Sequence, residues 1–389
     1  MTWLNAKLKY VARFGYGDGL PANEAQDGAF RVYGSNGPYS YFSKVNTGAP
    51  AIIVGRKGSY GKVNWTPEPC FASDTTFFID ASTCNHELRW VYWLLQTLRL
   101  DEGTDEAAVP GLNRETAYAK DVKVPELSLQ RAIADYLDRE TAKIDAMIAA
   151  KGRQLDLLAE KRRAFITRAV ICGLDPKVSL RDSGITWLGK TPVHWDTKRV
   201  KYLFRLVTEQ APADNDYELL SLYTDIGVRP RKEMEARGNK ATTTDNYWLV
   251  RPGDLIVNKL LAWMGAFGIS EYEGVTSPAY DILRPINGVN TAYYHHLFRC
   301  GVCIPEIHRR SRGIMDMRLR LYFDELGDMR VPVPPLPEQQ AIVEHITHVT
   351  ARMDAMSDAT KRTIALLKER RAALITEAVT GKTEVKLKQ

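Results

Sequence analysis

Two long stretches of the chain, residues 131–170 and 340–379, carry apolar or small residues at alternating steps of four and three. Neither stretch contains proline, and a glycine follows each one closely, Gly173 or Gly381. Helices commonly end at glycine, and a seam with a seven-residue period is typical of paired helices rather than of a core helix. The pattern therefore predicts two long helices that form a coiled coil. The seam contains Leu137, Thr141, Ile144, Ile148, Leu155, Leu158, Phe165 and Ala169 in the first stretch, and Ile346, Thr350, Met353, Ile364, Leu367, Leu374 and Ala378 in the second.

The two stretches are copies of one another. Shifted by 209 residues they align without a gap, and about 17 of the 40 positions are identical. Matching polar residues interrupt both seams, among them Arg162 and Arg371, and such residues usually set the register and the partner of a coiled coil. We therefore expect an antiparallel helix pair with a pseudo-two-fold axis. At 1.5 Å per residue each helix would be about 60 Å long.

The residues before each long helix show a different pattern. In residues 1–128, short β-type runs at 51–54 and 75–79 lie between turn clusters, and one helical pattern covers 87–100. A second region of this kind resembles the first, so we predict an α+β fold with two globular domains separated by two long antiparallel coiled-coil helices. The predicted boundaries are 1–128 for the first globular domain, 129–173 for the central helix, 174–195 for a connector, 196–336 for the second globular domain, 337–381 for the C-terminal helix and 382–389 for a tail.

Composition adds little to this picture. The chain has 44% hydrophobic and 26% charged residues, which is ordinary for a soluble globular protein. A net charge of +6 permits a polyanionic partner without requiring one. The five cysteines are scattered, no signal peptide opens the chain, and no apolar run is long enough to cross a membrane. We therefore expect a cytoplasmic protein with no membrane span.

Three segments could suggest catalysis or metal binding, and each has a simpler interpretation. Residues 15–19 are rich in glycine but lack the following helix that a phosphate-binding loop requires, so they predict a turn. Residues 277–280 (Ser-Pro-Ala-Tyr) resemble an amino-methyltransferase tetrad without its second proline, and a strand end is the better interpretation. Cys300 and Cys303 do not have a common zinc-site spacing relative to His295, His296 and His308. We therefore expect no catalytic residue and no metal site.

Polar and basic residues gather in glycine-bounded loops at matched places in the two globular domains. Duplex DNA is bound through cations that contact phosphates and through amide, hydroxyl or guanidinium groups that contact base edges. The predicted phosphate contacts are Lys57, Lys62, Lys259, Arg310 and Arg312. The predicted base-edge contacts are Ser35, Asn36, Ser59, Tyr60, Asn113 and Arg114 in the first domain and Trp263, Ser277 and Tyr280 in the second, and Tyr33, Arg56 and Asn258 complete the candidate set. Any one of these could be a solvated loop residue, but their matched placement favours DNA contact.

Several segments resemble the specificity subunits of type I restriction-modification enzymes. They are residues 182–189, 192–195, 333–342 and 368–381, the loop 55–62, and residues 313–318 with 321–323. The resemblance covers the whole chain and includes its duplicated layout. Residues 124–130 depart from the Pro-Pro-Leu-x-Glu-Gln box that is present at 334–339, which should weaken the N-terminal cap of the first long helix.

The resemblance implies that each globular domain is a target recognition domain that reads one half of a split DNA sequence. The two long helices would set the unspecified gap between the halves and dock two methyltransferase (M) subunits, and restriction/translocase (R) subunits would join this assembly. S-adenosylmethionine, Mg²⁺ and ATP would bind to those partners, so this chain would carry no cofactor and no catalytic activity of its own. The base-reading residues of the family do not carry over, because the recognition loops differ with the target.

Two other interpretations stay open at the level of sequence. The chain could be the DNA-recognition subunit of a two-component restriction enzyme with fused methylation and cleavage. It could also be a scaffold whose globular domains bind proteins rather than DNA.

Overall fold

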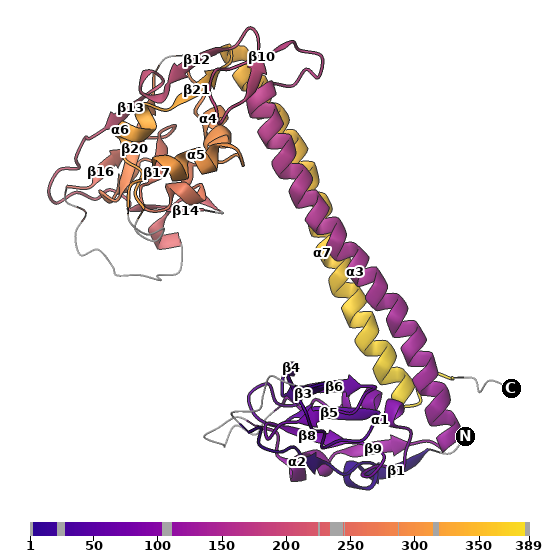
Figure 1. Cartoon of the computed structure of the whole chain (residues 1–389). Coiled ribbons are helices and arrows are strands. Elements are labelled where there is room, and N and C mark those ends of the chain that lie inside the picture. The colour runs from indigo at the N-terminus through magenta and orange to yellow at the C-terminus, as the bar shows by residue number, and fades with distance from the viewer. Residues whose placement is uncertain are drawn as a thin grey trace. The chain divides into compact units, whose positions relative to one another are not determined.

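A computed structural model describes residues 3–21, 28–102, 111–224, 226–233, 244, 246–286, 288–313 and 319–385. The chain forms two compact units, one made of Met1–Arg153 with Thr360–Gln389 and the other of Gln154–Ala359. Two long helices, α3 (Leu127–Cys172) and α7 (Leu336–Val379), each contribute one part to either unit (Figure 1). Residues 314–318, which carry part of the family resemblance, lie outside the described residues. Among the described helices, none combines the length and the apolar character needed to cross a bilayer.

The first unit is built around an antiparallel sheet with the strand order β2-β8-β5-β6. Its core continues into the helix pair, because Ile52 and Trp90 belong to the same buried cluster as Leu137 of α3 and Val379 of α7. The elements of this globular domain, called head 1 below, are β1 (Leu4–Lys7), η1 (Leu8–Tyr10), β2 (Gly15–Tyr16), β3 (Phe30–Gly34), β4 (Gly37–Phe42), β5 (Ala51–Gly55), β6 (Val63–Thr66), β7 (Phe71–Ala72), β8 (Thr76–Ile79), α1 (Leu88–Leu95), α2 (Arg114–Tyr118) and β9 (Asp121–Val124).

The second unit repeats this plan around a sheet with the order β13-β20-β17-β18. Here too the core joins the globular domain, head 2, to the helices, since Phe267 and Tyr294 cluster with Val170 of α3 and Ile346 of α7. The elements are β10 (Leu180–Asp182), β11 (Lys190–Pro192), β12 (Asp196–Arg199), η2 (Val200–Tyr202), β13 (Phe204–Val207), β14 (Leu220–Tyr223), β15 (Gly227–Pro230), η3 (Arg231–Glu233), β16 (Trp248–Val250), β17 (Leu255–Asn258), η4 (Ala262–Met264), β18 (Phe267–Ile269), β19 (Gly274–Thr276), β20 (Tyr280–Pro285), α4 (Thr291–Phe298), α5 (Cys303–Arg310), α6 (Phe323–Gly327) and β21 (Arg330–Val333).

The two long helices carry equivalent ion pairs. In the first unit Arg371 Nε lies 2.9 Å from Asp145 Oδ1, and in the second unit Arg162 Nε lies 3.5 Å from Asp354 Oδ1. The sequence repeat relates Asp145 to Asp354 and Arg162 to Arg371, so each ion pair is the other with the two helices exchanged. The predicted α+β fold with an antiparallel, internally repeated helix pair is confirmed, and the polar seam arginines make the interhelical contacts.

The start of the first long helix keeps the contacts that the family box provides in the second copy. Gln339 Nε2 donates to the Pro334 carbonyl at 2.8 Å, and its Oε1 accepts the Asn290 N–H at 2.9 Å. Gln130 makes the same two bonds, to the Pro125 carbonyl at 2.8 Å and from the Glu87 N–H at 3.0 Å. The departure at residues 124–130 therefore leaves the buried glutamine contact intact. The residues next to Gln130 differ from the family box, but the glutamine itself is retained.

The helix predicted over 87–100 is shorter in the structure. Helix α1 covers Leu88–Leu95 and ends at Gln96, and Arg99 has a positive φ of 47°. A residue with left-handed backbone cannot continue an α-helix. The apolar residues after residue 95 therefore belong to a non-helical turn that packs on the domain, and they do not extend helix α1.

Candidate nucleic-acid interface

Two loops of head 1 meet at one carbonyl oxygen. The Thr75 carbonyl accepts the Ser35 hydroxyl at 2.6 Å, the Arg56 N–H at 2.8 Å and the Lys57 N–H at 3.2 Å. This joins the β3–β4 turn to the β5–β6 loop at one end of the central sheet. Ser35 itself is buried and its hydroxyl is used in this contact, so its role in the structure is to hold the loops together.

The predicted residues Asn36 and Lys62 lie side by side. Lys62 Nζ donates to the Asn36 backbone carbonyl at 2.9 Å and to its side-chain oxygen at 2.8 Å, and both residues are exposed. No carboxylate takes part in this contact, so the ammonium charge remains available to an anion. This position fits a phosphate contact better than a base contact, because the amide oxygen of Asn36 is already occupied.

Two predicted arginines converge on an aromatic ring that the sequence did not single out. The guanidinium carbon of Arg56 lies 5.2 Å from the ring centre of Tyr16, and that of Arg114 lies 5.0 Å from the same centre and 5.6 Å from that of Tyr118. The Arg56 carbonyl accepts the Leu112 N–H at 2.8 Å, which brings the β5–β6 loop next to the start of α2. Tyr16 is 49% exposed. We name Tyr16, Arg56 and Arg114 the Tyr16 cluster.

The remaining candidates of head 1 have separate surroundings. Asn113 is the N-cap of α2, and its side-chain oxygen accepts the Glu115 N–H at 2.8 Å. Tyr33 is buried in a small apolar cluster, and Tyr60 packs partly against the main core. Lys57 and Ser59 are exposed in the β5–β6 loop. Tyr33 thus supports the fold at this surface, while Lys57 and Ser59 face solvent.

Head 2 places its predicted cations in ion pairs. Lys259 Nζ lies 3.4 Å from Asp281 Oδ1, and both side chains are largely buried. Burial raises the pKa of Asp281, and Lys259 acts in the opposite direction. The neighbouring Asn258 is buried, and its side-chain oxygen accepts the Leu260 N–H at 3.0 Å. These two residues therefore organise the turn after β17.

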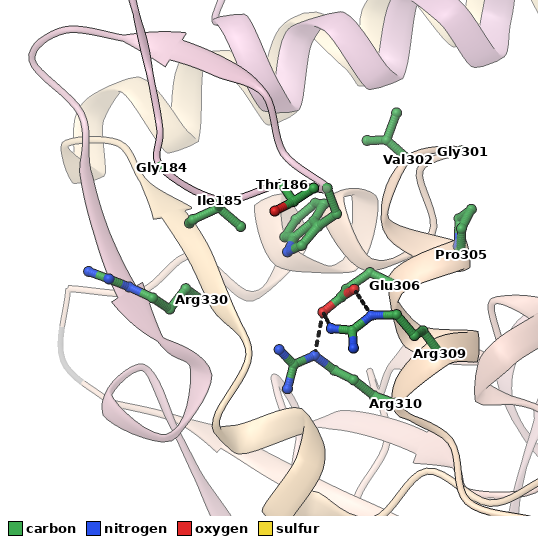
Figure 2. Close-up of a pocket in the computed structure, with 11 residues that line it drawn as sticks. Gly184, Ile185, Thr186, Gly301, Val302, Pro305, Glu306, Arg309, Arg310 and Arg330 are labelled. Carbon is green, nitrogen blue, oxygen red and sulfur yellow. Dashed lines mark hydrogen bonds and ion pairs between the residues drawn. The ribbon is translucent and has the colours of Figure 1, made fainter.

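The basic run after α5 is neutralised in the same way. Glu306 accepts from Arg309 at 2.8 Å and from Arg310 at 2.6 Å, and Figure 2 shows its carboxylate between these two arginines. Arg312 pairs with both Asp324 and Glu325. Burial opposes ionisation of Glu306, but the hydrogen bonds from the two arginines hold its pKa below the usual value. Much of the positive charge predicted for DNA phosphates is thus balanced within head 2.

The arginines of α5 also border the cavity drawn in Figure 2. This cavity of about 850 Å³ lies between α5 and the connector segment 184–187, part of a segment that carries the family resemblance. Trp187 lines it, and the indole N–H of Trp187 has no hydrogen-bond partner in the described structure. The family-like connector therefore forms one wall of a cavity whose other wall is basic and apolar.

Ser277 and Tyr280 line a smaller cavity in head 2. It has a volume of about 240 Å³, and Tyr223, Arg231 and Tyr247 also line it. Burial raises the pKa of Tyr280. The third predicted base contact, Trp263, lies elsewhere: its indole N–H donates to the Leu260 carbonyl at 3.0 Å and its ring contacts His308. The cavity thus brings Ser277 and Tyr280 together, and Trp263 is not among the described residues that line it.

The segment once considered for zinc is a packed interior. Cys300 and Cys303 are buried, and burial lowers the pKa of His295 to about 3 and that of His296 to about 4. Among the described residues no group of three or more histidine, cysteine or acidic side chains could hold a metal ion. In the glycine-rich segment 15–19 one glycine is required by close packing, because a Cβ at Gly17 would lie 2.0 Å from the Ser73 carbonyl oxygen.

Strand pairing identifies which residues of the two heads are equivalent. Strand β5 pairs with β8 as β17 pairs with β20, with Val54 opposite Phe77 and Val257 opposite Asp281. The Arg56 N–H donates to the Thr75 carbonyl, and the Lys259 N–H donates likewise to the Ala279 carbonyl. The equivalent pairs at this site are therefore Arg56 with Lys259, Phe77 with Asp281, Arg114 with Phe323 and Tyr16 with Thr208.

Comparisons with known proteins cover nearly the whole chain. No family model matches it. It is 21% identical over 415 residues to the type I restriction enzyme EcoDI specificity subunit of Escherichia coli, with 98% of this chain and 88% of the relative covered. A chain solved in a study of complex assembly and conformational transition of the type I restriction-modification system matches with a TM-score of 0.64, 16% identity and 98% of each chain covered. The HsdS subunit from Thermoanaerobacter tengcongensis matches with a TM-score of 0.55 and 16% identity, over 98% of this chain and 97% of the other.

These matches include both heads and both long helices. The solved structures show the same fold, and the sequence match extends across the internal duplication. The resemblance predicted from sequence is confirmed: over nearly its whole length the chain is similar to a specificity subunit of a type I restriction enzyme, and it has the fold of the solved type I restriction-modification chains.

Proposed function

We propose that this chain reads a bipartite, gapped DNA sequence, with one half read by each head. The proposed recognition domains are residues 1–128 and 196–336. The observation that supports this most directly is that the two heads share a sheet framework but carry different side chains at equivalent positions. A common framework with different contact residues is what two readers of different half-sites require.

The two long helices would set the gap between the half-sites. Residues 129–173 and 337–381 are the proposed spacers, joined by the connector 174–195, with 382–389 as a tail. Equivalent ion pairs at the two interhelical contacts support a pseudo-symmetric surface. A pseudo-two-fold surface suits the docking of two methyltransferase subunits, to which restriction/translocase subunits would be added.

The chemistry would lie on those partners. S-adenosylmethionine would bind the methyltransferase subunits, and ATP and Mg²⁺ would serve the complete complex. The chain itself would act on double-stranded DNA by position and contact alone, in the cytoplasm where that DNA is found. Its exposed lysines in head 1, Lys57 and Lys62, are the proposed phosphate contacts.

Methylome sequencing tests the proposal directly. The chain is expressed with its cognate methyltransferase subunit in a host that lacks its own modification systems. We expect a split, gapped motif that is methylated only when this chain is present. Replacing residues 1–128 with those of a relative that has another target should change one half of the motif and leave the other.

Each other result has a distinct meaning. An undivided motif would mean that only one head reads DNA. An assembled complex that neither methylates nor binds DNA would favour a scaffold role. Cleavage and methylation carried by one fused partner would place the chain in a two-component enzyme instead.

A further inference from the structure

The Tyr16 cluster holds two guanidinium groups in place through aromatic rings, so their N–H donors are not used up by the contacts that restrain them. The Arg56 guanidinium lies 5.2 Å and 5.8 Å from the ring centres of Tyr16 and Phe77. Arg114 is held by Tyr16 and Tyr118. Stacking on aromatic rings restricts a long side chain without using its N–H groups.

The arginines of this cluster are not neutralised as those of head 2 are. Within the described residues, no carboxylate lies within ion-pairing distance of Arg56. Arg114 has one carboxylate within this range, that of Glu115 at 3.5 Å, and the Glu115 side chain is 74% exposed. The Arg114 Nε is buried and makes no hydrogen bond, so the donors that Arg114 can offer to a ligand are those of its terminal Nη groups. Because the Glu115 side chain is largely exposed, its contact with Arg114 is weak, and a ligand can replace it.

Three other base-edge candidates of head 1, Asn36, Asn113 and Ser35, already use their side-chain oxygens within the fold. An asparagine recognises adenine by accepting one hydrogen bond and donating another. The side-chain oxygen of Asn113 caps α2, and that of Asn36 accepts from Lys62. Ser35 is buried against Thr75. Recognition of adenine through these asparagines would require breaking contacts that hold the loops.

Two guanidinium groups with free donors favour one base. Guanine presents O6 and N7, two adjacent acceptors in the major groove, and arginine matches them with two parallel N–H groups. A side chain fixed before binding loses little rotamer entropy when it makes such a pair. We propose that the Tyr16 cluster reads guanine in the half-site of head 1, with Arg56 and Arg114 as the reading groups and Tyr16 as the positioning residue.

Head 2 does not carry this reader. Its equivalent positions hold Thr208, Lys259 and Phe323, and Lys259 is paired with the largely buried Asp281. The cluster is therefore specific to head 1, and its loss should affect one half-site only. This inference rests on the proposed function, since it names the base that one half of the proposed interface reads.

The experiment uses the complex of this chain with its cognate methyltransferase subunit. Methylome sequencing first gives the motif, and the exchange of residues 1–128 assigns one half to head 1. Arg56→Lys and Arg114→Lys keep the positive charge but replace the planar, ring-stacked guanidinium and its parallel N–H donors with a single flexible ammonium. We expect each to lose about ten- to a hundredfold in discrimination at a single G·C pair of that half-site, with the other half unchanged. The control Lys57→Gln should weaken binding to all sequences alike.

Modified bases show whether the contact is to guanine itself. Replacing the guanine with 7-deazaguanine removes N7, and replacing it with hypoxanthine leaves both major-groove acceptors in place. Wild-type binding should fall several-fold with the first and stay unchanged with the second, and the lysine variant should not respond to either. Co-purification with the methyltransferase subunit and unchanged reading of the other half-site establish that each variant is folded.

Three results would overturn the inference while leaving the proposed function intact. They are a head 1 half-site without a G·C pair, a uniform loss of affinity in the lysine variants like that of Lys57→Gln, and an equal response of wild type and variant to 7-deazaguanine. Failure of the proposed function is different, because the assembled complex would then produce no gapped methylation at all.

Discussion

The two heads place chemically different groups at the same point of the same sheet. Head 1 has a guanidinium over aromatic rings, with Arg56 near Tyr16 and Phe77, whereas head 2 has an ammonium paired with a carboxylate, Lys259 with Asp281. The aromatic arrangement restrains the guanidinium without using its N–H donors, whereas in the ion pair the two opposite charges balance each other. A duplicated framework can therefore keep its backbone contacts and still change what its surface recognises.

The difference extends below the surface, to the far end of the same two strands. In head 2 Arg284 Nη2 lies 2.7 Å from Asp254 Oδ2, and the Asp254 side chain is 2% exposed. In head 1 the equivalent of Arg284 is Asp80, which accepts the Gly48 N–H at 2.7 Å and the Ser82 N–H at 2.9 Å. Head 2 thus closes its sheet with an ion pair where head 1 uses a carboxylate-capped turn.

The largest effect is expected when the buried pair of head 2 is broken. Asp254→Asn leaves Arg284 without its main partner, and removing one member of a buried ion pair destabilises a protein by about 3–5 kcal/mol. Hydrogen–deuterium exchange should show faster exchange in β17 and β20 while β5 and β8 keep their rates. The control is Arg251→Gln, which removes the partly exposed contact of Arg251 with Glu209, leaves Glu209 beside Arg284, and should lower the free energy of unfolding by less than about 1 kcal/mol. Equal exchange in both heads after Asp254→Asn would contradict the comparison.

The second largest effect is expected at the N-termini of α3 and α7, where Gln130 and Gln339 make equivalent hydrogen bonds. Gln130→Ala and Gln339→Ala each leave a buried carbonyl and a partly buried N–H without their side-chain partner, which costs about 1–3 kcal/mol. The Gln130 substitution should be the more damaging, because the Gln130 amide also contacts His86 Nδ1 at 3.0 Å. Urea denaturation of each variant followed by local hydrogen exchange measures the two losses. A negligible loss for Gln130→Ala would mean that the departure at residues 124–130 does weaken the first cap.

The sequence patterns predict the long helices and the central strands, because these elements are formed by residues that are close together in the chain. The heptad seams correspond to α3 and α7, and the runs at 51–54 and 75–79 correspond to β5 and β8. The pairing of Arg309 and Arg310 with Glu306 was also open to sequence reasoning, since these residues are three and four apart on one helix. The basic run was interpreted by its charge alone, and the acidic residue before it was not counted.

The site could be predicted only in part, because its decisive contacts join distant segments. Tyr16 lay in a segment interpreted as a turn, and only the pairing of β2 with β8 places it beside Arg56 and Arg114. The use of Asn113 as a helix cap has a local signal in the sequence, because asparagine is favoured just before the first turn of a helix. Ser35 and Tyr33 could not be recognised as buried from a polar loop sequence.

A smaller effect is expected from pH, which should change the stability of the two heads in opposite directions. Burial raises the pKa of Asp281, so its ionised form is disfavoured in folded head 2, and that penalty is present above the raised pKa. As the pH falls through this value, Asp281 takes up a proton and the penalty disappears. Asp281→Asn should remove this dependence. Asp80 of head 1 behaves oppositely: although burial opposes it, hydrogen bonds from Ser82 and Gly48 lower its pKa, so its contribution is lost as the pH falls through that lowered value. Amide exchange in β20 and β8, recorded between pH 3 and 6, separates the two cases, and parallel profiles would contradict this assignment.

The smallest effects are expected at the two interhelical ion pairs, which are equivalent in the two units. Asp145 with Arg371 and Asp354 with Arg162 are equivalent, partly exposed ion pairs, so Asp145→Asn and Asp354→Asn should each lower the free energy of unfolding by less than about 1 kcal/mol. Arg371 also lies 5.6 Å from the ring centre of Trp93, a restraint that favours a slightly larger loss for Asp145→Asn. Reversing both members of one pair should recover most of the loss, and its salt dependence should vanish with the pair. If instead a single substitution removed several kcal/mol, the helix pair would depend on one polar contact for its register, and the long apolar seam would not suffice to align the two helices.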